Sequence, residues 1–436
     1  MYPALRDVAD GPEGGRRFGR RSSRGVRTRV PLAVVLLGIT SMLTDISSEM
    51  VTAVLPLYLT FELSFTAFQF GLYEGLSQGL QAVMRLVGGA AADRRSGHKG
   101  LALIGYGSSA ITRLAILLTG GAWVPTTGVL LVDKMGKGVR TAPRDAMISL
   151  ASEPESMGRS FGVHRSLDAL GALIGPLLAF AILAMLPGSY DTVFIVSFSF
   201  AIVGVAVLGL FVERQPRRAP HEGGFRRVVM RQVVRNRSLR RVAFGATLLG
   251  LLTVSDAFIF LGYRRVADVR LEFFPLLFTG TAVVFLVFAV PVGRLADRIG
   301  RRIVFMGGYA VLGLVYIALL RPPPGVFGLV VVLGGLGLFY AATDGVLMAA
   351  ASEMLGVDTR ATGLAVVATG IAAGRFVASI AFGGLWSLSG PGTAFAVFAA
   401  AIPVALVAAW FLMSNLATMG EMATGVEQAG EAGGDE

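Results

Sequence analysis

The chain has 436 residues, of which 54% are hydrophobic and 15% charged, whereas an ordinary soluble domain carries about 25% charged residues. It has no cysteine and three histidines, which excludes disulfides and thiolate metal sites, and we expect neither a metal nor a cofactor. The net charge of +11 comes from arginines gathered in segments beside apolar runs, a pattern typical of membrane proteins rather than of nucleic-acid binding.

Long apolar runs recur from Pro31 to Met413, each close to the roughly 20 residues that cross the hydrocarbon core of a bilayer. The sequence therefore predicts an all-α, polytopic membrane protein with twelve transmembrane helices in two pseudo-symmetric six-helix bundles. The predicted spans are 31–60, 68–91, 100–119, 122–150, 161–186, 190–212, 242–262, 272–296, 303–320, 325–352, 361–388 and 392–414.

The distribution of arginine predicts the orientation of these helices. Eight arginines lie in the first 30 residues and ten lie between Glu213 and Arg241, and basic loops stay in the cytoplasm. Both termini are then cytoplasmic, and we expect the protein in the cell inner membrane. The predicted domains are an Arg-rich tail (1–30), an N-terminal bundle (31–212), a basic cytoplasmic linker (213–241), a C-terminal bundle (242–414) and an acidic disordered tail (415–436).

The two halves of the chain share four landmarks in the same order and at a nearly constant spacing. Four collinear matches indicate a duplicated six-helix unit, which is how many carriers are built. The matches pair Thr44–Asp45 with Ser255–Asp256, Gly89–Arg94 with Gly293–Arg298, Asp145 and Ser152–Glu153 with Asp344 and Ser352–Glu353, and Arg159–Gly162 with Arg360–Gly363.

The second of these matches resembles the loop signature of the major facilitator superfamily, close to G-x-L-A-D-R-x-G-R-K/R. The copy from Gly293 to Arg302 fits without gaps, and the first copy carries one extra residue between Asp93 and Gly97. Lys134-Met-Gly-Lys137-Gly138 is similar to the family's R-x-x-Q-G motif. The resemblance covers about residues 30 to 414 and implies a carrier whose loop motif acts as a conformational latch, formed by Gly89, Asp93, Arg94, Gly293, Asp297 and Arg298.

Gly171-Ala-Leu-Ile-Gly175-Pro176 resembles the G-x-x-x-G-P motif of antiporters in the same superfamily. The glycine pair that usually follows is absent from this chain. Close packing of the helix is an equally good interpretation, because small residues let membrane helices approach each other.

Charged residues inside the predicted spans need a reason, since each costs at least about 2.5–3.5 kcal/mol at the bilayer centre. They lie in stripes at helical spacing, mostly in the first half, and the second half has Asp256, Asp344 and Arg375. Lysines near mid-membrane favour an anionic or zwitterionic solute. The predicted substrate-binding residues are Glu74, Gln78, Asp133, Lys134, Lys137, Arg140, Asp168 and Asp344.

Asp45, Glu49 and Asp256 are the carboxylates that we expect to couple transport to protons. Asp45 and Glu49 lie one helical turn apart, and two partly desolvated carboxylates at that spacing resist ionising together. The alternative is that Asp45 only pairs with a base on the span 122–150 or 161–186.

These features predict a secondary active transporter that moves a small, anionic or zwitterionic organic solute by alternating access, coupled to protons. No Walker-type G-x-x-x-x-G-K-S/T sequence is present, so ATP does not drive this chain directly. A proton-antiporting exporter of hydrophobic drugs is the alternative within the class. A membrane-embedded enzyme or a non-transporting sensor is the alternative from another class, although no catalytic His/Asp cluster is visible. The expected partners are the solute, protons and the lipid bilayer, with no nucleic acid.

Overall fold

The computed structural model describes residues 30–94, 97–153, 156–213, 235–267, 269–321, 325–355 and 357–414. These residues form helices and short connections, without a β-strand. An all-helical fold is what a bilayer demands, because a helix satisfies its own backbone hydrogen bonds where no water is present. The predicted tails, and most of the predicted linker (214–234), lie outside the described residues.

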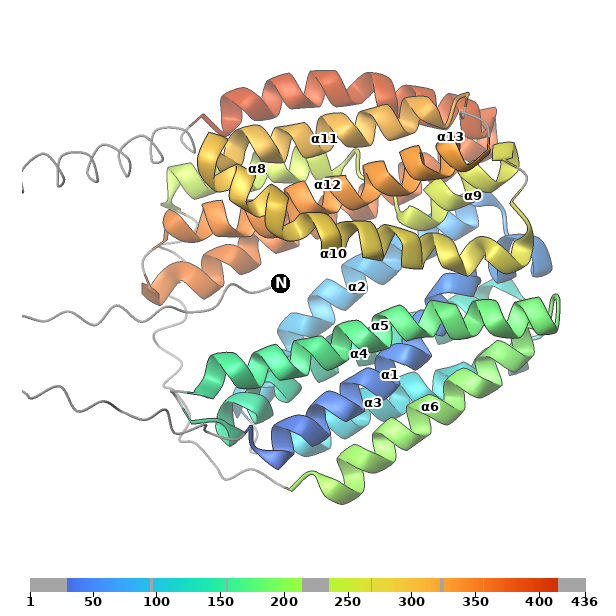
Figure 1. Ribbon diagram of the computed structural model, residues 1–436, viewed down its shortest axis with the longest axis vertical. Helices are drawn as coiled ribbons and strands as arrows, with labels where there is room; N and C mark the ends of the chain where they lie inside the picture. The colour runs from blue at the N-terminus through green and yellow to red at the C-terminus, as the bar shows by residue number, and fades with distance from the viewer. Residues whose placement is uncertain are drawn as a thin grey trace, which may run out of the picture.

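The first half of the chain forms one group of helices, drawn blue to green in Figure 1. A π-helical turn, η1, extends the end of α1, and a 3-10 turn, η2, ends α3. The elements are α1 (Leu32–Leu57), η1 (Tyr58–Glu62), α2 (Ala67–Arg94), α3 (His98–Ala115), η2 (Ile116–Leu118), α4 (Trp123–Ala151), α5 (Met157–Met185) and α6 (Tyr190–Phe211).

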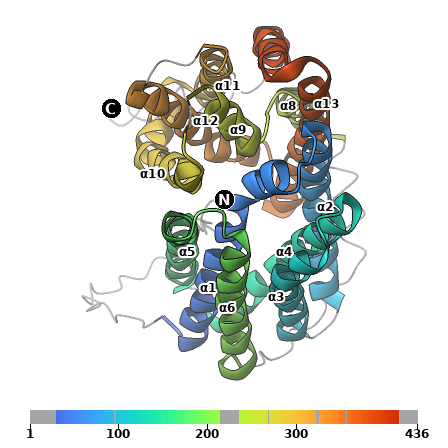
Figure 2. The same ribbon diagram turned by 90° about the vertical axis from the view of Figure 1, so that its right-hand side faces the viewer.

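The second half forms a second group beside the first, and Figure 2 shows the two groups end-on. Its last helix changes direction at Gly390, whose φ of 83° is readily adopted by glycine. This kink separates the predicted spans 361–388 and 392–414. The elements are α8 (Arg237–Gly250), α9 (Asp256–Ala267), η4 (Leu271–Phe273), α10 (Phe274–Ile299), α11 (Arg301–Ala318), α12 (Gly325–Glu353) and α13 (Val357–Leu412).

The predicted seventh span, 242–262, is wrong as a continuous helix. Helix α8 begins earlier, at Arg237, inside the region predicted as linker. The side chain of Asn236 caps it by accepting a hydrogen bond from the backbone N–H of Leu239 at 3.1 Å. The helix then stops at Gly250, and α9 starts at Asp256. Residues 251–255 between them are not helical, although they lie within the predicted apolar run.

Apart from the seventh, each predicted span overlaps a described helix, and eight described helices are long and apolar enough to cross a membrane. One of the eight, Thr362–Leu412, has 51 residues, enough for two crossings of roughly 20 residues each. The helices that fall short are α2, α4, α8 and α9. Charged and other polar residues within α2 and α4 lower their mean hydropathy, whereas α8 and α9 are short.

Helix α2 packs directly on α13 and joins the two halves along a seam of glycines. A Cβ atom on Gly71 would lie 2.4 Å from the backbone oxygen of Ser379, and one on Gly383 would lie 2.5 Å from that of Ala67. Real Cβ atoms do not come this close to other atoms, so this seam requires glycine. Such close approach through small residues is common between membrane helices.

The predicted outer end of the molecule is closed by further contacts between the halves. The backbone N–H of Phe68 donates to Ser387 Oγ at 2.8 Å, and the Arg264 guanidinium lies 4.4 Å from the ring centroid of Phe61. The rings of Phe70 and Phe258 meet edge to face at 5.0 Å. We conclude that this conformation is closed at the end where η1 and α9 lie.

Cysteine labelling tests the predicted orientation, because the chain contains no cysteine of its own. Ser189 and Ser238 are both half-buried serines at opposite ends of the bundles, which makes them a matched pair. In intact cells, an impermeant thiol reagent is expected to label Ser189→Cys and to spare Ser238→Cys, which should react only after the membrane is opened. Labelling of Ser238→Cys in sealed cells would overturn the orientation.

Candidate functional site

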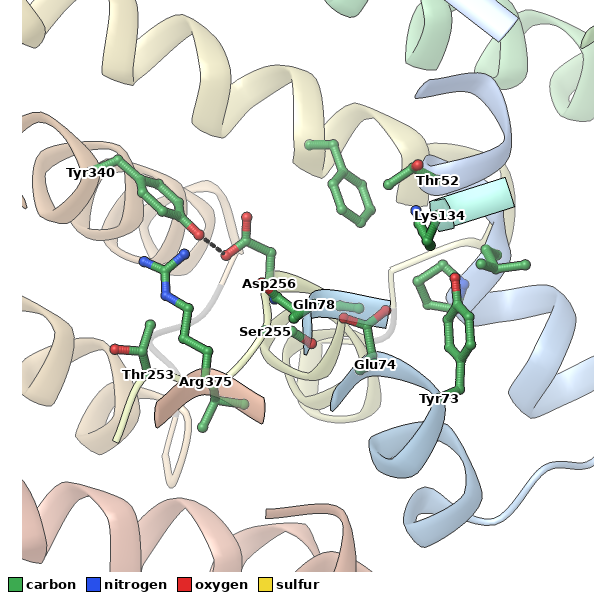
Figure 3. A pocket seen from close by; sticks show the side chains of 15 residues that line it. Thr52, Tyr73, Glu74, Gln78, Lys134, Thr253, Ser255, Asp256, Tyr340 and Arg375 are labelled. Carbon is green, nitrogen blue, oxygen red and sulfur yellow. Dashed lines mark hydrogen bonds between the residues drawn. The ribbon is translucent and has the colours of Figure 1, made fainter. Parts of the chain in front are cut away.

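A cavity lies between the two halves and is lined by residues of both. Its volume is about 190 Å³, below the roughly 300–1,000 Å³ of pockets that hold drug-sized ligands, so it suits a small solute. Figure 3 shows polar side chains from both halves directed into it. The first half contributes Thr52, Leu55, Pro56, Tyr73, Glu74, Gln78 and Lys134, and the second half contributes Thr253, Val254, Ser255, Asp256, Ala257, Phe278, Tyr340 and Arg375.

The break between α8 and α9 forms one wall of this cavity. The hydroxyl of Tyr316 bridges the break, donating to the backbone oxygen of Leu252 at 2.9 Å and accepting from the N–H of Val254 at 2.9 Å. Thr253 and the next residues line the cavity. Irregular backbone at membrane depth is tolerated where it is buried in protein or lines a cavity, and broken helices mark the binding sites of many carriers.

Four charged side chains line the cavity, two from each half. Glu74 and Lys134 come from α2 and α4, and Asp256 and Arg375 come from α9 and α13. Tyr340 donates a hydrogen bond of 2.6 Å to Asp256 Oδ1, drawn as a dashed line in Figure 3. The cavity is therefore charged on both sides and carries both signs.

A second group of charges lies outside the cavity lining, on α1, α4 and α5. We call these residues the α1–α4–α5 cluster. Lys137 Nζ lies 3.2 Å from Glu49 Oε1, and Arg140 lies 3.4 Å from Asp45 Oδ1. Arg144 lies 3.0 Å from Asp145 Oδ1 and 3.7 Å from Asp168 Oδ1. The cluster thus consists of Asp45, Glu49, Lys137, Arg140, Arg144, Asp145 and Asp168.

Polar side chains surround this cluster. The Arg140 guanidinium lies 4.4 Å from the ring centroid of Tyr106, and the Tyr106 hydroxyl is 3.2 Å from Ser41 Oγ. Ser41 in turn is 2.9 Å from His164 Nε2. The cations of the cluster are held by carboxylates and an aromatic face, so Lys137 and Arg140 do not present free positive charge to the cavity.

Arg113 and Asp133 form a separate, buried ion pair. Their side chains are 3.0 Å apart and only 3% and 8% exposed, and Arg113 also donates to the hydroxyls of Ser47 and Ser48. Removing one partner of such a pair leaves an uncompensated buried charge and is strongly destabilising. This geometry is that of a structural pair that holds α1, α3 and α4 together.

The predicted latch residues lie at the ends of α2 and α10. Asp297 lies 3.2 Å from Arg301, and Arg301 also pairs with Glu353 at the end of α12. Arg298 is exposed, and the side chains of Asp93 and Arg94 lie outside the described residues. A Cβ atom on Gly89 would make only ordinary contact, at 3.8 Å from Ala142 Cβ, and one on Gly293 would meet nothing within 4 Å.

The structure brings together only some of the predicted site residues. Glu74, Gln78 and Lys134 line the cavity with the predicted proton-coupling residue Asp256, whereas Asp45 and Glu49 belong to the α1–α4–α5 cluster. Asp344 is exposed and does not line the cavity. The predicted substrate-binding residues outside the lining are Asp133, Lys137, Arg140, Asp168 and Asp344.

The two glycines of the antiporter-like motif lie against α1. A Cβ atom on Gly171 would lie 2.5 Å from the backbone oxygen of Met42, and one on Gly175 would lie 2.8 Å from that of Ile46. Both glycines therefore let α5 approach α1 closely, as the packing interpretation expects.

Sequence reasoning missed several residues of the cavity. Arg375 was visible as a lone charge in an apolar run, but without a partner it could not be assigned. Thr253-Val-Ser255-Asp256 has the residue types that favour a helix start, and this signal could have located the break. Tyr340 gave no signal, because a tyrosine in an apolar span is common.

Comparisons with known proteins agree with this architecture. A family model described as Major Facilitator Superfamily matches residues 37–264 and 257–421. An uncharacterized MFS-type transporter of Methanocaldococcus jannaschii is 28% identical over 369 residues, which are 82% of this chain and 89% of that protein. An uncharacterized protein of Mycobacterium tuberculosis is 29% identical over 187 residues, which are 43% of this chain and 44% of that protein.

Solved transporter structures share the fold at low sequence identity. The nucleoside transporter NupG has a TM-score of 0.72 at 14% identity, covering 87% of this chain and 99% of that one. A POT family transporter has a TM-score of 0.73 at 12% identity, covering 88% and 96%. A bacterial homolog of the human lysosomal transporter Spinster has a TM-score of 0.63 at 15% identity, covering 90% and 96%. At these identities the likeness concerns the fold alone.

Proposed function

The chain belongs to the major facilitator superfamily, and from this membership we propose a secondary active carrier that moves a small, charged organic solute across the cell membrane. One observation carries the choice of solute: a small cavity between the two halves is lined by two acids and two bases. Charged groups at membrane depth mark substrate pathways, because they are too costly to keep without a role.

Alternating access explains why the cavity lies where it does. Seven lining residues come from one half and eight from the other, so any movement of the halves changes the cavity. A solute held in the cavity would be accessible from the inner side of the membrane when the outer contacts are closed. It would be accessible from the outer side when those contacts open. Rocking of two bundles around a fixed site is a common design among carriers.

We also propose that protons drive the carrier through the α1–α4–α5 cluster. The cluster contains four carboxylates and three bases, so one carboxyl group has no base of its own. Asp168 Oδ1 is buried and accepts no hydrogen bond among the described residues. A proton on Asp168 or Asp45 balances the charge of the cluster, and its loss leaves a net negative charge in a medium of low dielectric. Asp256 is a second candidate, because it lies in the cavity itself.

The alternative functions are a drug exporter, an enzyme and a sensor, and each makes a different demand on the cavity. A proton-antiporting exporter of hydrophobic drugs needs a largely apolar site, whereas this cavity exposes four charged side chains. An enzyme needs a nucleophile or a general base aligned with its partner, and the hydrogen-bonded pair that lines this cavity, Asp256 with Tyr340, contains no Ser–His or Cys–His arrangement of that kind. A sensor built on the same fold is distinguished from a carrier only by a measurement of transport.

Asp297 is expected to act on conformational change and not on solute binding. It pairs with Arg301, which also reaches Glu353, so it holds the inner ends of α10 and α12 together. Asp297→Asn should lower the rate of uptake by about tenfold, equivalent to roughly 1.4 kcal/mol, with little change in binding affinity. Initial uptake rates and equilibrium binding, measured on the same preparation, check this expectation. A collapse of affinity with an unchanged rate at saturation would refute the latch.

A two-stage experiment tests the proposed function. Purified protein is first screened by thermal shift against a library of small solutes, because a ligand that binds the folded state raises its melting temperature. A radiolabelled hit is then offered to proteoliposomes with and without an inward proton gradient. We expect saturable uptake that the gradient increases. Binding without any uptake would favour a sensor, and conversion of the hit to a product would favour an enzyme.

A further inference from the structure

The charges of the cavity differ from most other buried charges in the described residues, which form ion pairs; the buried Arg302 is also without an acid but lies against Trp410. Ion pairs occur in the α1–α4–α5 cluster, between Arg113 and Asp133, and near the helix ends. None of Glu74, Lys134, Asp256 and Arg375 takes part in any of these pairs. Four charged groups therefore line one small cavity without direct ion-pair partners.

Two polar groups of the lining, one of them charged, also lack hydrogen bonds that their burial calls for. Arg375 Nε is buried without a hydrogen-bond partner, and so is the hydroxyl of the neighbouring lining residue Ser255. Asp256 is different, because it accepts the 2.6 Å hydrogen bond from Tyr340. A buried polar group without a partner costs free energy, and a buried charge costs more. A ligand with complementary groups would remove this cost.

The balance of charge restricts that ligand. The lining has two carboxylates and two cations, so it is neutral when all four are ionised. An anion could pair with Arg375 or Lys134 but would also face the carboxylates of Glu74 and Asp256, and a cation would face the two bases. Asp344 lies outside the lining; its charge acts on Arg375 and Asp256, but its carboxylate is not among the groups that a ligand in the cavity would contact. A solute with one group of each sign satisfies both.

We propose that the cavity binds a small zwitterion with an amino group and a carboxylate, such as an amino acid, through Glu74 of the first half and Arg375 of the second. This inference rests on the proposed carrier function and specifies its substrate class. The guanidinium of Arg375 offers two parallel donors to the carboxylate, a geometry that favours arginine over lysine. Glu74 accepts the ammonium group.

The other two charges keep the site neutral while it is occupied. Lys134 lies on the same side of the cavity as Glu74, and Asp256 lies on the same side as Arg375 in Figure 3. The zwitterion then joins the two halves by one ion pair at each end. Its binding energy favours the conformation in which the halves approach each other, which is what a carrier requires of its substrate.

The test compares three forms of each of two amino acids on the full-length protein in detergent, by titration calorimetry. The probes are leucine and alanine, each with its N-acetyl derivative, which is an anion, and its amide, which is a cation. At least one free amino acid is expected to bind roughly tenfold or more tightly than both of its derivatives, as one lost ion pair predicts. Equal affinity for a derivative, or no binding of either amino acid, would overturn the zwitterion site.

Two variants assign the ends of the ligand. Glu74→Gln should weaken binding of the free amino acid and of its amide by about tenfold, and should leave the weaker N-acetyl form unchanged. Arg375→Gln should weaken the free amino acid and the N-acetyl form and spare the amide. Arg165→Gln removes an exposed cation of α5 outside the cavity and should change none of the three affinities. The reverse pattern for the two variants would refute this orientation.

These outcomes are separable from failure of the proposed function. If proteoliposomes accumulate a solute that carries charge of a single sign, the carrier function stands and the zwitterion site is wrong. If a free amino acid binds with the expected selectivity but is never transported, the site stands and the carrier function is wrong. The comparison of the free amino acid with its two derivatives is made on the unaltered protein. It therefore tests the proposal even if one of the variants fails to fold.

Discussion

Asp45→Asn is expected to abolish solute accumulation driven by a pH gradient while leaving exchange of solute at equal concentrations largely intact. Asp45 lies 3.4 Å from Arg140 in a cluster with one more carboxylate than bases. Asparagine keeps the shape of the side chain but cannot bind and release a proton. The carrier should then still change between its two conformations and exchange solute across the membrane, but no step of its cycle would depend on protons.

The measurement is uptake into proteoliposomes, with and without an imposed pH gradient, followed by exchange of labelled for unlabelled solute. Asp191→Asn is the matched control, because Asp191 is an exposed aspartate in the first turn of α6 and belongs to none of the ion pairs of the cluster. The control should accumulate solute like the unaltered protein. Accumulation by Asp45→Asn with normal pH dependence would reduce Asp45 to a structural partner of Arg140.

The second large effect is expected when one methyl group is added at Gly71, on the seam where α2 packs against α13. A Cβ atom on Gly71 would lie 2.4 Å from the backbone oxygen of Ser379 and 3.1 Å from the Cα of Gly383. Both neighbours are backbone atoms, so relief requires α2 and α13 to separate. Overpacking of this kind costs about 1–3 kcal/mol, and Gly71→Ala should therefore lower transport roughly tenfold or more.

Gly107→Ala is the control for this effect, since a Cβ on that helical glycine meets nothing within 4 Å. Transport should be unchanged in the control. The closed outer end can be monitored directly with cysteines at Phe68 and Ser387, whose backbone nitrogen and hydroxyl oxygen are 2.8 Å apart. Gly71→Ala should reduce the fraction of the cysteine pair that crosslinks. Normal transport and crosslinking would show that the seam tolerates separation.

Much of the fold follows from the sequence, because the bilayer leaves few choices. Runs of apolar residues must become helices, and the duplicated landmarks, such as Asp93 and Asp297, place the boundary between the halves. The break at 251–255 could not be obtained from hydropathy, since its residues lie in an apolar run. The break is stabilised by the hydroxyl of Tyr316, which forms hydrogen bonds with two of its backbone groups. Tyr316 is distant in sequence, so hydropathy around the break does not reveal this contact.

The candidate site was harder to predict than the fold for a related reason. Charges on one helix face can be recognised from spacing, so Glu74, Gln78 and Lys134 were expected at a binding site and line the cavity. Whether a charge is free or paired depends on other helices. Lys137 lies about one helical turn from Lys134 in the same motif, yet Glu49 of α1 pairs with it. The sequence shows a row of charges, and only the packing shows which of them remain available.

The central claim, alternating access around the cavity, is tested most directly by locking the outer end. The double variant Phe68→Cys/Ser387→Cys would join α2 to α13 across the two halves in a chain that otherwise has no cysteine. In proteoliposomes, oxidation should stop uptake of the solute, and reduction should restore it, while each single-cysteine variant transports in both conditions. Uptake that continues at the normal rate in the fully crosslinked protein would contradict the claim, since the halves could then transport without separating at that end.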